Sequence, residues 1–183
     1  MEPFLCVLFA PGLLAGVWLM LIYNSLVRHR NHVAESWSGI DTELKRRYDL
    51  IPNLVSTVKG YAAHEAQVLE AVARARAASG SGVDQRADAE RSVVSGLRTF
   101  LAVAESYPQL KADAQFLALQ RELAETENRI QAARRFYNAN VRDLNNLVQS
   151  FPSNLVASTF GFRQSSFFEV ESALEREAPK VAL

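Results

Sequence analysis

Apolar residues recur every three or four positions through most of the chain beyond residue 39, which is the period of a helix that packs against its neighbours. Steps of four and three alternate without a skip in the first series: Ile40, Leu44, Arg47, Ile51, Leu54, Val58, Tyr61, Glu65, Val68 and Val72. A shorter series follows at Val93, Leu97, Phe100 and Ala104. The third series comprises Phe116, Gln120, Leu123, Glu127, Ile130, Arg134, Tyr137, Val141, Leu144, Val148 and Phe151. No stretch alternates apolar and polar residues over the length of a strand, so the pattern predicts an all-α protein.

Pro52 lies inside the first series but does not shift its phase. A proline in a helix interior costs about 3 kcal/mol because it removes a backbone donor and clashes with the preceding turn. A turn of two or three residues would normally reset the phase, so the pattern favours one long helix that bends near Pro52. The alternative is a second helix that is capped by Asp49 and carries Pro52 in its first turn, where a backbone donor is not needed.

Glycine, proline and small polar residues mark the ends of the predicted helices. The segment "ASGSGVD", residues 78–84, predicts a loop after the first long helix. A second helix is expected over about residues 86–106 and a third over about residues 108–150, before Pro152. The run "SNLVAST" predicts a short fourth helix with Ser153 as its cap. The predicted fold is therefore an antiparallel bundle of three long helices plus a short fourth helix.

The third predicted helix, about 60 Å long, is roughly twice the length of the second. Part of it must pack on the first helix alone or bind something else. In an up-down-up order the first and third helices run parallel, which would place the C-terminal stretch far from a membrane at the N-terminus. This stretch holds half of the ten phenylalanines, and they either cover the bundle end or contact a partner or a lipid interface. The five are Phe151, Phe160, Phe162, Phe167 and Phe168.

The segment Phe4–Tyr23 carries no charged residue. As a helix it would be about 30 Å long, which matches the hydrocarbon core of a bilayer, and Pro11 and Gly12 are tolerated in such helices. A cleaved secretory signal is the alternative, but no Lys or Arg precedes the apolar run and no small-x-small site follows it. We therefore expect residues 1–26 to form an uncleaved membrane anchor, residues 27–170 a helical bundle, and residues 171–183 a C-terminal tail.

Charge around the expected span predicts its orientation. Glu2 is the only charged residue before it, whereas Arg28 and Arg30 follow at once. The positive-inside rule then places the bundle in the cytoplasm. Across the whole chain 20 basic residues balance 20 acidic ones, so there is no general attraction to nucleic acid. The single cysteine, Cys6, excludes an intrachain disulfide.

Several polar residues interrupt the apolar series. Arg47 and Glu65 fall in the first, and Gln120, Glu127 and Arg134 fall in the third at intervals of seven. They either mark the edges of the packed surface, where long side chains reach water, or form a buried layer of ion pairs between helices. Separately, Asp41 precedes Lys45 by four residues, which predicts a helical ion pair. Three asparagines in the long third helix either bond to neighbouring elements, line an oligomer seam or lie at the surface: Asn138, Asn145 and Asn146.

Candidate catalytic or metal-binding motifs are weak. His64 and Glu65 begin "HEAQV", in which Val68 replaces the second histidine of a zinc-protease motif. His29 and His32 are three residues apart, without a clear third ligand. The sequence contains neither a phosphate-binding GxxxxGK[ST] loop nor a GxSxG motif. We therefore predict no catalytic, cofactor-binding or metal-binding residues, no cofactor and no small-molecule substrate.

The chain resembles the LemA family over about residues 20–170. The stretches that carry the resemblance are "YNSLVRHRNHV" from Tyr23, "ESWSGIDTELKRRYDLIPNLVSTVKGYAAHE" from Glu35, "YPQLKADAQFLALQRELAETENRI" from Tyr107, "ARRFYNANVRDLNN" from Ala133, and "FPSNLVASTFGF" from Phe151 with the later "FFEV". The resemblance implies a bacterial protein with one N-terminal span and a helical bundle, with no established catalytic activity. It also implies a role in envelope or membrane-associated processes, in some members linked to organelle-like membrane formation, and a membrane-bound protease as a partner.

The expected function is that of a non-enzymatic scaffold or adaptor in the bacterial cell membrane. Phe4–Tyr23 would hold it in the lipid bilayer as a single-pass anchor, and the bundle would bind another membrane protein or copies of itself. The alternative is an oligomeric protein that remodels membranes directly.

Overall fold

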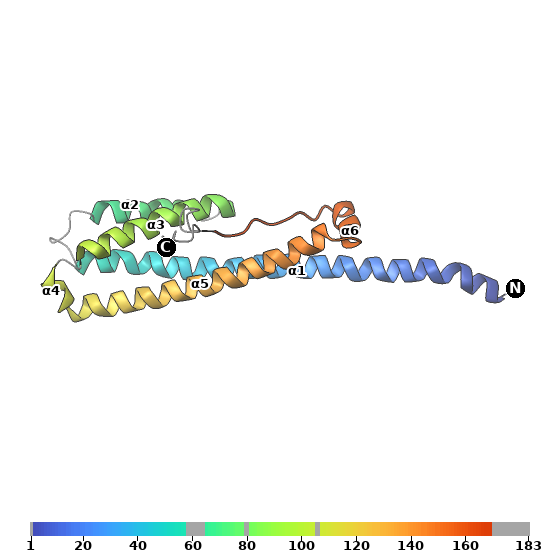
Figure 1. Cartoon of the computed structure of the whole chain (residues 1–183), viewed down its shortest axis with the longest axis horizontal. Coiled ribbons are helices and arrows are strands. Elements are labelled where there is room, and N and C mark those ends of the chain that lie inside the picture. The colour runs from blue at the N-terminus through green and yellow to red at the C-terminus, as the bar shows by residue number, and fades with distance from the viewer. Residues whose placement is uncertain (1, 58–64, 79–80, 105–106, 170–183) are drawn as a thin grey trace, which may run out of the picture. The chain divides into compact units, whose positions relative to one another are not determined.

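The computed structural model describes residues 2–57, 65–78, 81–104 and 107–169, with side chains from residue 11 onward except at 65–68, 103, 109 and 111. Regular structure within these residues is entirely helical, which confirms the predicted all-α class (Figure 1). The helices are α1 (Glu2–Thr57), α2 (Glu65–Ala77), α3 (Val83–Ala104), α4 (Pro108–Lys111), α5 (Ala114–Gln149) and α6 (Ser153–Thr159). The chain divides into two compact units, which are described separately. Unit 1 comprises Met1–Gly39 and Arg135–Ser166, and unit 2 comprises Ile40–Arg134 and Phe167–Leu183.

The core of unit 2 is built from the predicted apolar series. Its part of α1, together with α2, α3 and the first part of α5, contributes side chains that are at most 6% exposed. These include Ile40, Leu44, Ile51, Leu54, Val72, Val93, Leu97, Phe100, Ala104, Phe116, Leu123 and Ile130. The period of three and four residues therefore identified the packed face of each helix correctly. Val58, Tyr61 and the side chains of Glu65 and Val68 lie outside the described residues.

Pro52 does not interrupt α1, which continues to Thr57 as the unchanged phase predicted. Because Pro52 has no N–H, the carbonyl of Tyr48, four residues earlier, lacks its usual helical donor. Arg76 of α2 supplies one, since its Nη2 donates to Tyr48 O at 2.7 Å and also to Asp49 Oδ1 at 2.7 Å. A side chain from a neighbouring helix thus satisfies the acceptor that the proline leaves open.

The same contact corrects the prediction of one helix from Ile40 to Val72. Residues 48 and 76 of an uninterrupted helix would be about 40 Å apart, whereas Arg76 is in hydrogen-bond contact with Tyr48. The chain must therefore reverse direction between α1 and α2, and α2 packs back onto α1. The apolar phase did not reveal this reversal because Val72 faces a core in either arrangement.

Two further helix ends differ from the predictions. The expected helix over residues 108–150 is divided into α4 and α5, because the Asp113 carboxylate caps α5 by accepting a hydrogen bond from the Phe116 N–H (2.8 Å). The cap of α6 was predicted wrongly, since Pro152 occupies the cap position without a side-chain bond. Ser153 instead donates to the carbonyls of Leu147 (2.7 Å) and Ser150 (2.9 Å), which ties α6 to the end of α5.

In unit 1, α5 runs antiparallel to α1. The ring of Tyr137 on α5 lies 5.3 Å from that of Trp37, whereas Phe160, beyond α6, lies 4.9 Å from Tyr23. The parallel arrangement inferred from the sequence is therefore wrong. That prediction treated α1 and α2 as one continuous helix and so omitted the reversal of chain direction between them. Phe160 and Phe162 consequently lie beside Tyr23, at the end of the apolar run Phe4–Tyr23, instead of far from it.

The end of α6 is fixed by a glycine in the left-handed conformation. Gly161 has φ 72°, its N–H donates to Ser158 O at 3.4 Å, and the Phe162 N–H donates to Ala157 O at 2.9 Å. These two bonds form a Schellman motif, in which glycine at this position avoids a steric penalty. The motif turns the chain so that Phe162 also packs on Tyr23, with ring centres 5.7 Å apart.

Side-chain bonds hold the segment that follows α6 against α5. Asn145, which is 7% exposed, donates through Nδ2 to Ser165 O (3.0 Å) and accepts the Ser165 N–H through Oδ1 (2.9 Å). The Tyr137 hydroxyl donates to Ser166 O at 3.0 Å. Of the three asparagines singled out in the sequence, Asn145 thus bonds to a neighbouring segment, whereas Asn146 is exposed.

Candidate functional site

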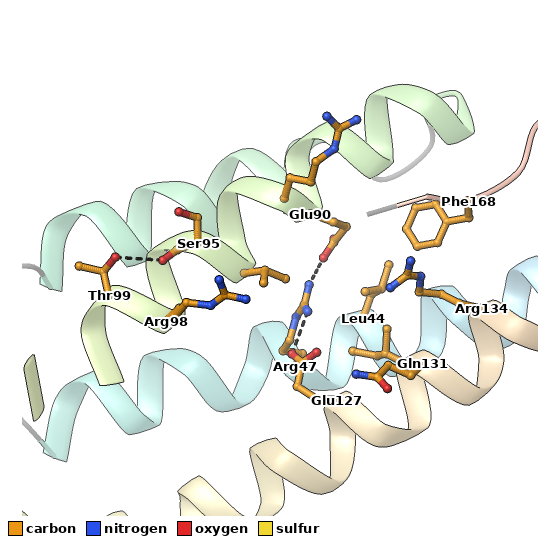
Figure 2. Close-up of a pocket in the computed structure, with 13 residues that line it drawn as sticks. Leu44, Arg47, Glu90, Ser95, Arg98, Thr99, Glu127, Gln131, Arg134 and Phe168 are labelled. Carbon is orange, nitrogen blue, oxygen red and sulfur yellow. Dashed lines mark hydrogen bonds and ion pairs between the residues drawn. The ribbon is translucent and has the colours of Figure 1, made fainter. Parts of the chain in front are cut away.

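A buried arginine joins three helices of unit 2. Arg47 of α1 has a side chain that is only 2% exposed, and it forms ion pairs with Glu90 of α3 and Glu127 of α5. Its Nη2 contacts Glu90 Oε2, and its Nη1 donates to Glu127 Oε1 at 2.8 Å. Figure 2 shows the guanidinium between the two carboxylates. Glu90 is as deeply buried as Arg47, whereas Glu127 is 31% exposed.

A second buried arginine extends this set of charges. Arg86 of α3, also 2% exposed, donates through Nη2 to Asp41 Oδ1 at 2.8 Å, and its Nε lies 3.7 Å from Glu90 Oε1. Lys45 reaches the other oxygen of Asp41 at 2.8 Å, as the spacing of four residues predicted. The cluster therefore contains three basic and three acidic residues. We call it the charge cluster, and it comprises Asp41, Lys45, Arg47, Arg86, Glu90 and Glu127.

The partners of Asp41 shift its pKa. Burial disfavours the charged carboxylate and is the largest single influence, but the hydrogen bond from Lys45 and the charges of Arg86 and Lys45 together outweigh it. The pKa of Asp41 therefore lies below its ordinary value. The aspartate stays ionised at neutral pH and keeps the two cations paired.

The charge cluster decides part of the question left open by the sequence. Arg47 and Glu127 form a buried cross-helix ion pair, as one of the two interpretations proposed. Gln120 and Arg134 are half-buried, and the side chain of Glu65 lies outside the described residues. Sequence reasoning missed Glu90 and Arg86, although their spacing of four residues within α3 is typical of a helical ion pair.

A cleft of about 460 Å³ opens beside the charge cluster in unit 2 (Figure 2). Its walls come from α1, α3 and α5, and Phe168 closes one end near Arg134, whose guanidinium lies 5.9 Å from the ring centre. We call it the arginine cleft. Its lining residues are Leu44, Arg47, Glu90, Arg91, Val94, Ser95, Arg98, Thr99, Glu127, Ile130, Gln131, Arg134 and Phe168.

The lining of the arginine cleft combines positive charge with apolar surface. Four arginines face two glutamates, and both glutamates already bind Arg47, so the lining carries a formal charge of +2 (4 − 2). Val94 supplies partly exposed apolar surface between the charged groups, backed by Ile130 and Phe168, which are almost fully buried. Such a site suits a ligand that presents carboxylates next to apolar side chains.

His29 and His32 do not form part of a metal-binding group within the described part of the chain. His29 Nδ1 donates to the Ser25 carbonyl oxygen (2.8 Å), and His32 Nδ1 lies 3.8 Å from Glu35 Oε2. Among the residues that the structure describes, no group of three His, Cys, Asp or Glu side chains is placed to hold a metal ion. His64 lies outside the described residues.

The apolar start of α1 is long enough to cross a membrane. Within the described residues, one helix meets this test of length and composition, and its apolar part lies near the N-terminus. Within its described side chains, Leu13, Leu14 and Leu21 are each more than 60% exposed.

The architecture defines an all-helical protein whose helices are joined by a buried charge cluster and whose first helix carries a candidate membrane span. The LemA family model matches residues 36–183, and the chain belongs to the LemA family. This confirms the family resemblance recognised in the sequence.

Individual relatives agree with this assignment. The chain is 28% identical to Protein LemA of Metamycoplasma hominis over 84% of this chain and 71% of the relative. It is 23% identical to two proteins of Paramagnetospirillum magneticum, Magnetosome protein MamQ 1 and Magnetosome protein MamQ 2, over 85% of this chain and 67% of each relative.

Proposed function

We propose that the chain is a non-enzymatic adaptor of the bacterial cell membrane. In this proposal Phe4–Tyr23 anchors it as a single-pass protein, its helices form an antiparallel bundle on the cytoplasmic side, and the arginine cleft binds a segment of another membrane protein. The observation that carries the proposal is the cleft itself, with its excess of arginine and its apolar walls.

The chemistry of the cleft defines the partner segment. Arginine side chains bind carboxylates through paired, charge-assisted hydrogen bonds, and Val94, with the buried Ile130 and Phe168 behind it, offers apolar surface. The partner is therefore a short amphipathic segment that carries acidic residues. A membrane-bound protease, which the family resemblance implies, is the first protein in which to look for it.

The charge cluster holds two of the residues that line the cleft in place before a partner binds. Arg47 and Glu127 line the cleft and are held by contacts among α1, α3 and α5. Binding to a surface that is already ordered avoids much of the conformational entropy cost of association. This supports a fixed docking surface in unit 2 over one that forms only on binding.

Membrane anchoring rests on exposure and composition. Leu13, Leu14 and Leu21 near the start of α1 are largely exposed, and a bilayer would bury them. Arg28 and Arg30 follow directly, which favours a cytoplasmic location for the remainder.

Two serines of α3 provide a matched test. Ser95 lines the arginine cleft and Ser92 does not, although both are exposed. A photo-crosslinking amino acid is placed at each position in the full-length protein, expressed in cells, and adducts are identified by mass spectrometry. We expect a discrete heterologous adduct from position 95, absent from position 92, whose crosslinked peptide is acidic and amphipathic. Arg98→Glu should reduce it several-fold.

Other outcomes would contradict the proposal. An adduct of equal yield at both positions would show contact without use of the cleft. An adduct at position 95 that contains only a second copy of this chain would make the cleft a self-association site. Absence of any adduct in cells would remove the cleft as a docking surface.

A second candidate function is direct remodelling of the membrane by oligomers. It is favoured by the similarity to two proteins named as magnetosome proteins, because the family resemblance also implies a link to organelle-like membrane formation. The purified full-length protein reconstituted into liposomes should then change their shape in electron micrographs. Spherical vesicles at high protein occupancy would exclude this function.

A further inference from the structure

The chain around α6 exposes large apolar side chains on one short segment of unit 1. Phe151 is 79% exposed, Leu155 is 57% exposed and Phe160 is 50% exposed. On the same helix Val156 and Ala157 are almost fully buried. Because α6 already uses one face for packing, these side chains form a second apolar surface, of which only Phe160 is partly covered, by Tyr23. We call it the α6 face, and it comprises Phe151, Leu155 and Phe160.

The α6 face lies at the end of the candidate membrane span. The rings of Phe160 and Phe162 contact Tyr23 at 4.9 and 5.7 Å, and Tyr23 is the last residue of the uncharged run Phe4–Tyr23. Figure 1 shows α6 beside this part of α1. Tyrosine and tryptophan concentrate at the boundary between lipid headgroups and acyl chains, and phenylalanine is common on the apolar face of segments that lie there. If Phe4–Tyr23 crosses the bilayer, the three rings lie at that boundary.

Charge around the α6 face also suits a lipid surface. Arg28, Arg30 and Arg163 are exposed, and the Arg30 guanidinium lies 5.4 Å from the centre of the Phe162 ring. No Asp or Glu occurs between residues 3 and 34 or between residues 144 and 168. Exposed apolar side chains flanked by arginine are typical of segments that insert into the headgroup region of anionic membranes.

The contacts of the segment hold the α6 face in place. Ser153 bonds to carbonyls at the end of α5, the Schellman motif at Gly161 fixes the end of α6, and Asn145 forms two hydrogen bonds with Ser165. The face is therefore presented as an ordered surface next to Tyr23 and does not depend on membrane binding to form.

We propose that the α6 face inserts into the interface of the same bilayer that holds the N-terminal anchor, and so provides a second membrane contact. This inference rests on the anchoring part of the proposed function. Continuity with the candidate span selects the lipid bilayer as the occupant over a partner protein. With two contacts, the anchor cannot rotate freely about its axis, and unit 1 has a defined orientation at the membrane.

The test uses the full-length protein with Cys6→Ser, reconstituted into vesicles of phosphatidylcholine and phosphatidylglycerol. A polarity-sensitive fluorophore is attached to a single cysteine introduced by Leu155→Cys or Phe160→Cys, and quenching by brominated phospholipids is measured. The matched control is Phe136→Cys, because Phe136 is 63% exposed on α5 of the same unit. Its neighbour Tyr137 packs on Trp37, which is about 21 Å along α1 from Tyr23. Leu14→Cys reports insertion of the anchor itself.

We expect the labels at 155 and 160 to shift to the blue and to lose most of their fluorescence, more with bromine near the headgroup than near the chain end. The label at 136 should show neither change. If position 14 is quenched but positions 155 and 160 are not, the α6 face does not bind lipid and anchoring still stands. If position 14 is not quenched, anchoring fails and the inference falls with it. A blue shift at 155 and 160 without quenching would show that protein covers the face, which would also overturn the inference.

Discussion

The two units are stabilised in different ways although both are built from α1 and α5. Unit 2 buries charged groups, with Arg47 and Glu90 almost fully removed from water. Unit 1 buries neutral ones, such as Asn145 and Ser153, and the ion pair described in it, Arg142–Asp143, is exposed. Buried ion pairs cost desolvation but define which groups must meet. Unit 2 thus gains specificity in the arrangement of its helices, whereas unit 1 is held by aromatic packing and hydrogen bonds to backbone.

The largest expected effect comes from Arg47→Met. It leaves Glu90 buried without Arg47, and breaking one partner of a buried pair typically costs about 3–5 kcal/mol. Hydrogen exchange followed by mass spectrometry should show lower protection of α3 in unit 2 and little change in residues 137–149 of unit 1. The control is Arg46→Met, because the pair Arg46–Glu122 is 40% and 42% exposed and should cost at most about 1 kcal/mol. Equal effects of the two variants would contradict a special role for the buried pair.

A smaller effect is expected from Asn145→Ala in unit 1. The substitution removes both hydrogen bonds to Ser165 and leaves a partly buried backbone group unpaired, at a cost of about 1–3 kcal/mol. The Ser165 amide should then exchange faster while α3 in unit 2 is unaffected. Asn146→Ala is the control, since Asn146 is exposed and its loss should change stability by less than about 0.5 kcal/mol. Equal loss from both variants would contradict a specific role for the bond to Ser165.

Arg76→Met should destabilise unit 2 by about 1 kcal/mol, the usual net value of one hydrogen bond. The reason is that Tyr48 O then has neither a helical donor nor a side-chain donor. Pro52→Ala restores the helical N–H, so Arg76→Met should cost less in that background. A double-mutant cycle of unfolding free energies measures the difference. An equal cost in both backgrounds would show that Arg76 acts through Asp49 instead.

The smallest effect on stability is expected when Asp41 becomes protonated at low pH. Its pKa is lower in the folded state, so its contribution to stability is complete above the pKa of the unfolded chain, about 3.9, and is lost as pH falls through the folded value. Protection of α3 in unit 2 should therefore decrease below about pH 4. The contribution is modest because the carboxylate is 27% exposed. Asp41→Asn should make this part of the pH dependence smaller, and an unchanged profile in that variant would assign the effect to other carboxylates.

The sequence predicted the packed faces of the helices but not the path of the chain. Ile51 and Leu54 are both buried on either side of Pro52, as the unchanged phase required. The spacing of apolar residues does not indicate the direction of the chain, however. A helix that folds back onto the preceding helix buries the same residues as one that continues in the same direction. Missing the reversal before α2 inverted the expected direction of α5, and with it the position of Phe160 relative to Tyr23.

The candidate site shows the same limit. Arg47 and Glu127 stood out because they interrupt an apolar series, and they do meet. Glu90 and Arg86 did not stand out, since a charged pair spaced by four residues is also common on exposed helix surfaces. Only the packing of α3 against α1 places their side chains in the interior. The arginine cleft likewise depends on the spacing between α3 and α5, which no local pattern specifies.

The open carbonyl at Tyr48 has a consequence for helix register. In the neighbouring turns of α1 in unit 2, the backbone carbonyls accept hydrogen bonds from the helix itself. The Tyr48 carbonyl lacks such a bond, so Arg76 can bind a backbone acceptor at this position along the helix. A slide of α2 by a single turn would carry the guanidinium past it by about 5 Å. Pro52 therefore favours one alignment of α2 along α1, because only that alignment lets Arg76 bind the carbonyl that the proline leaves without a donor.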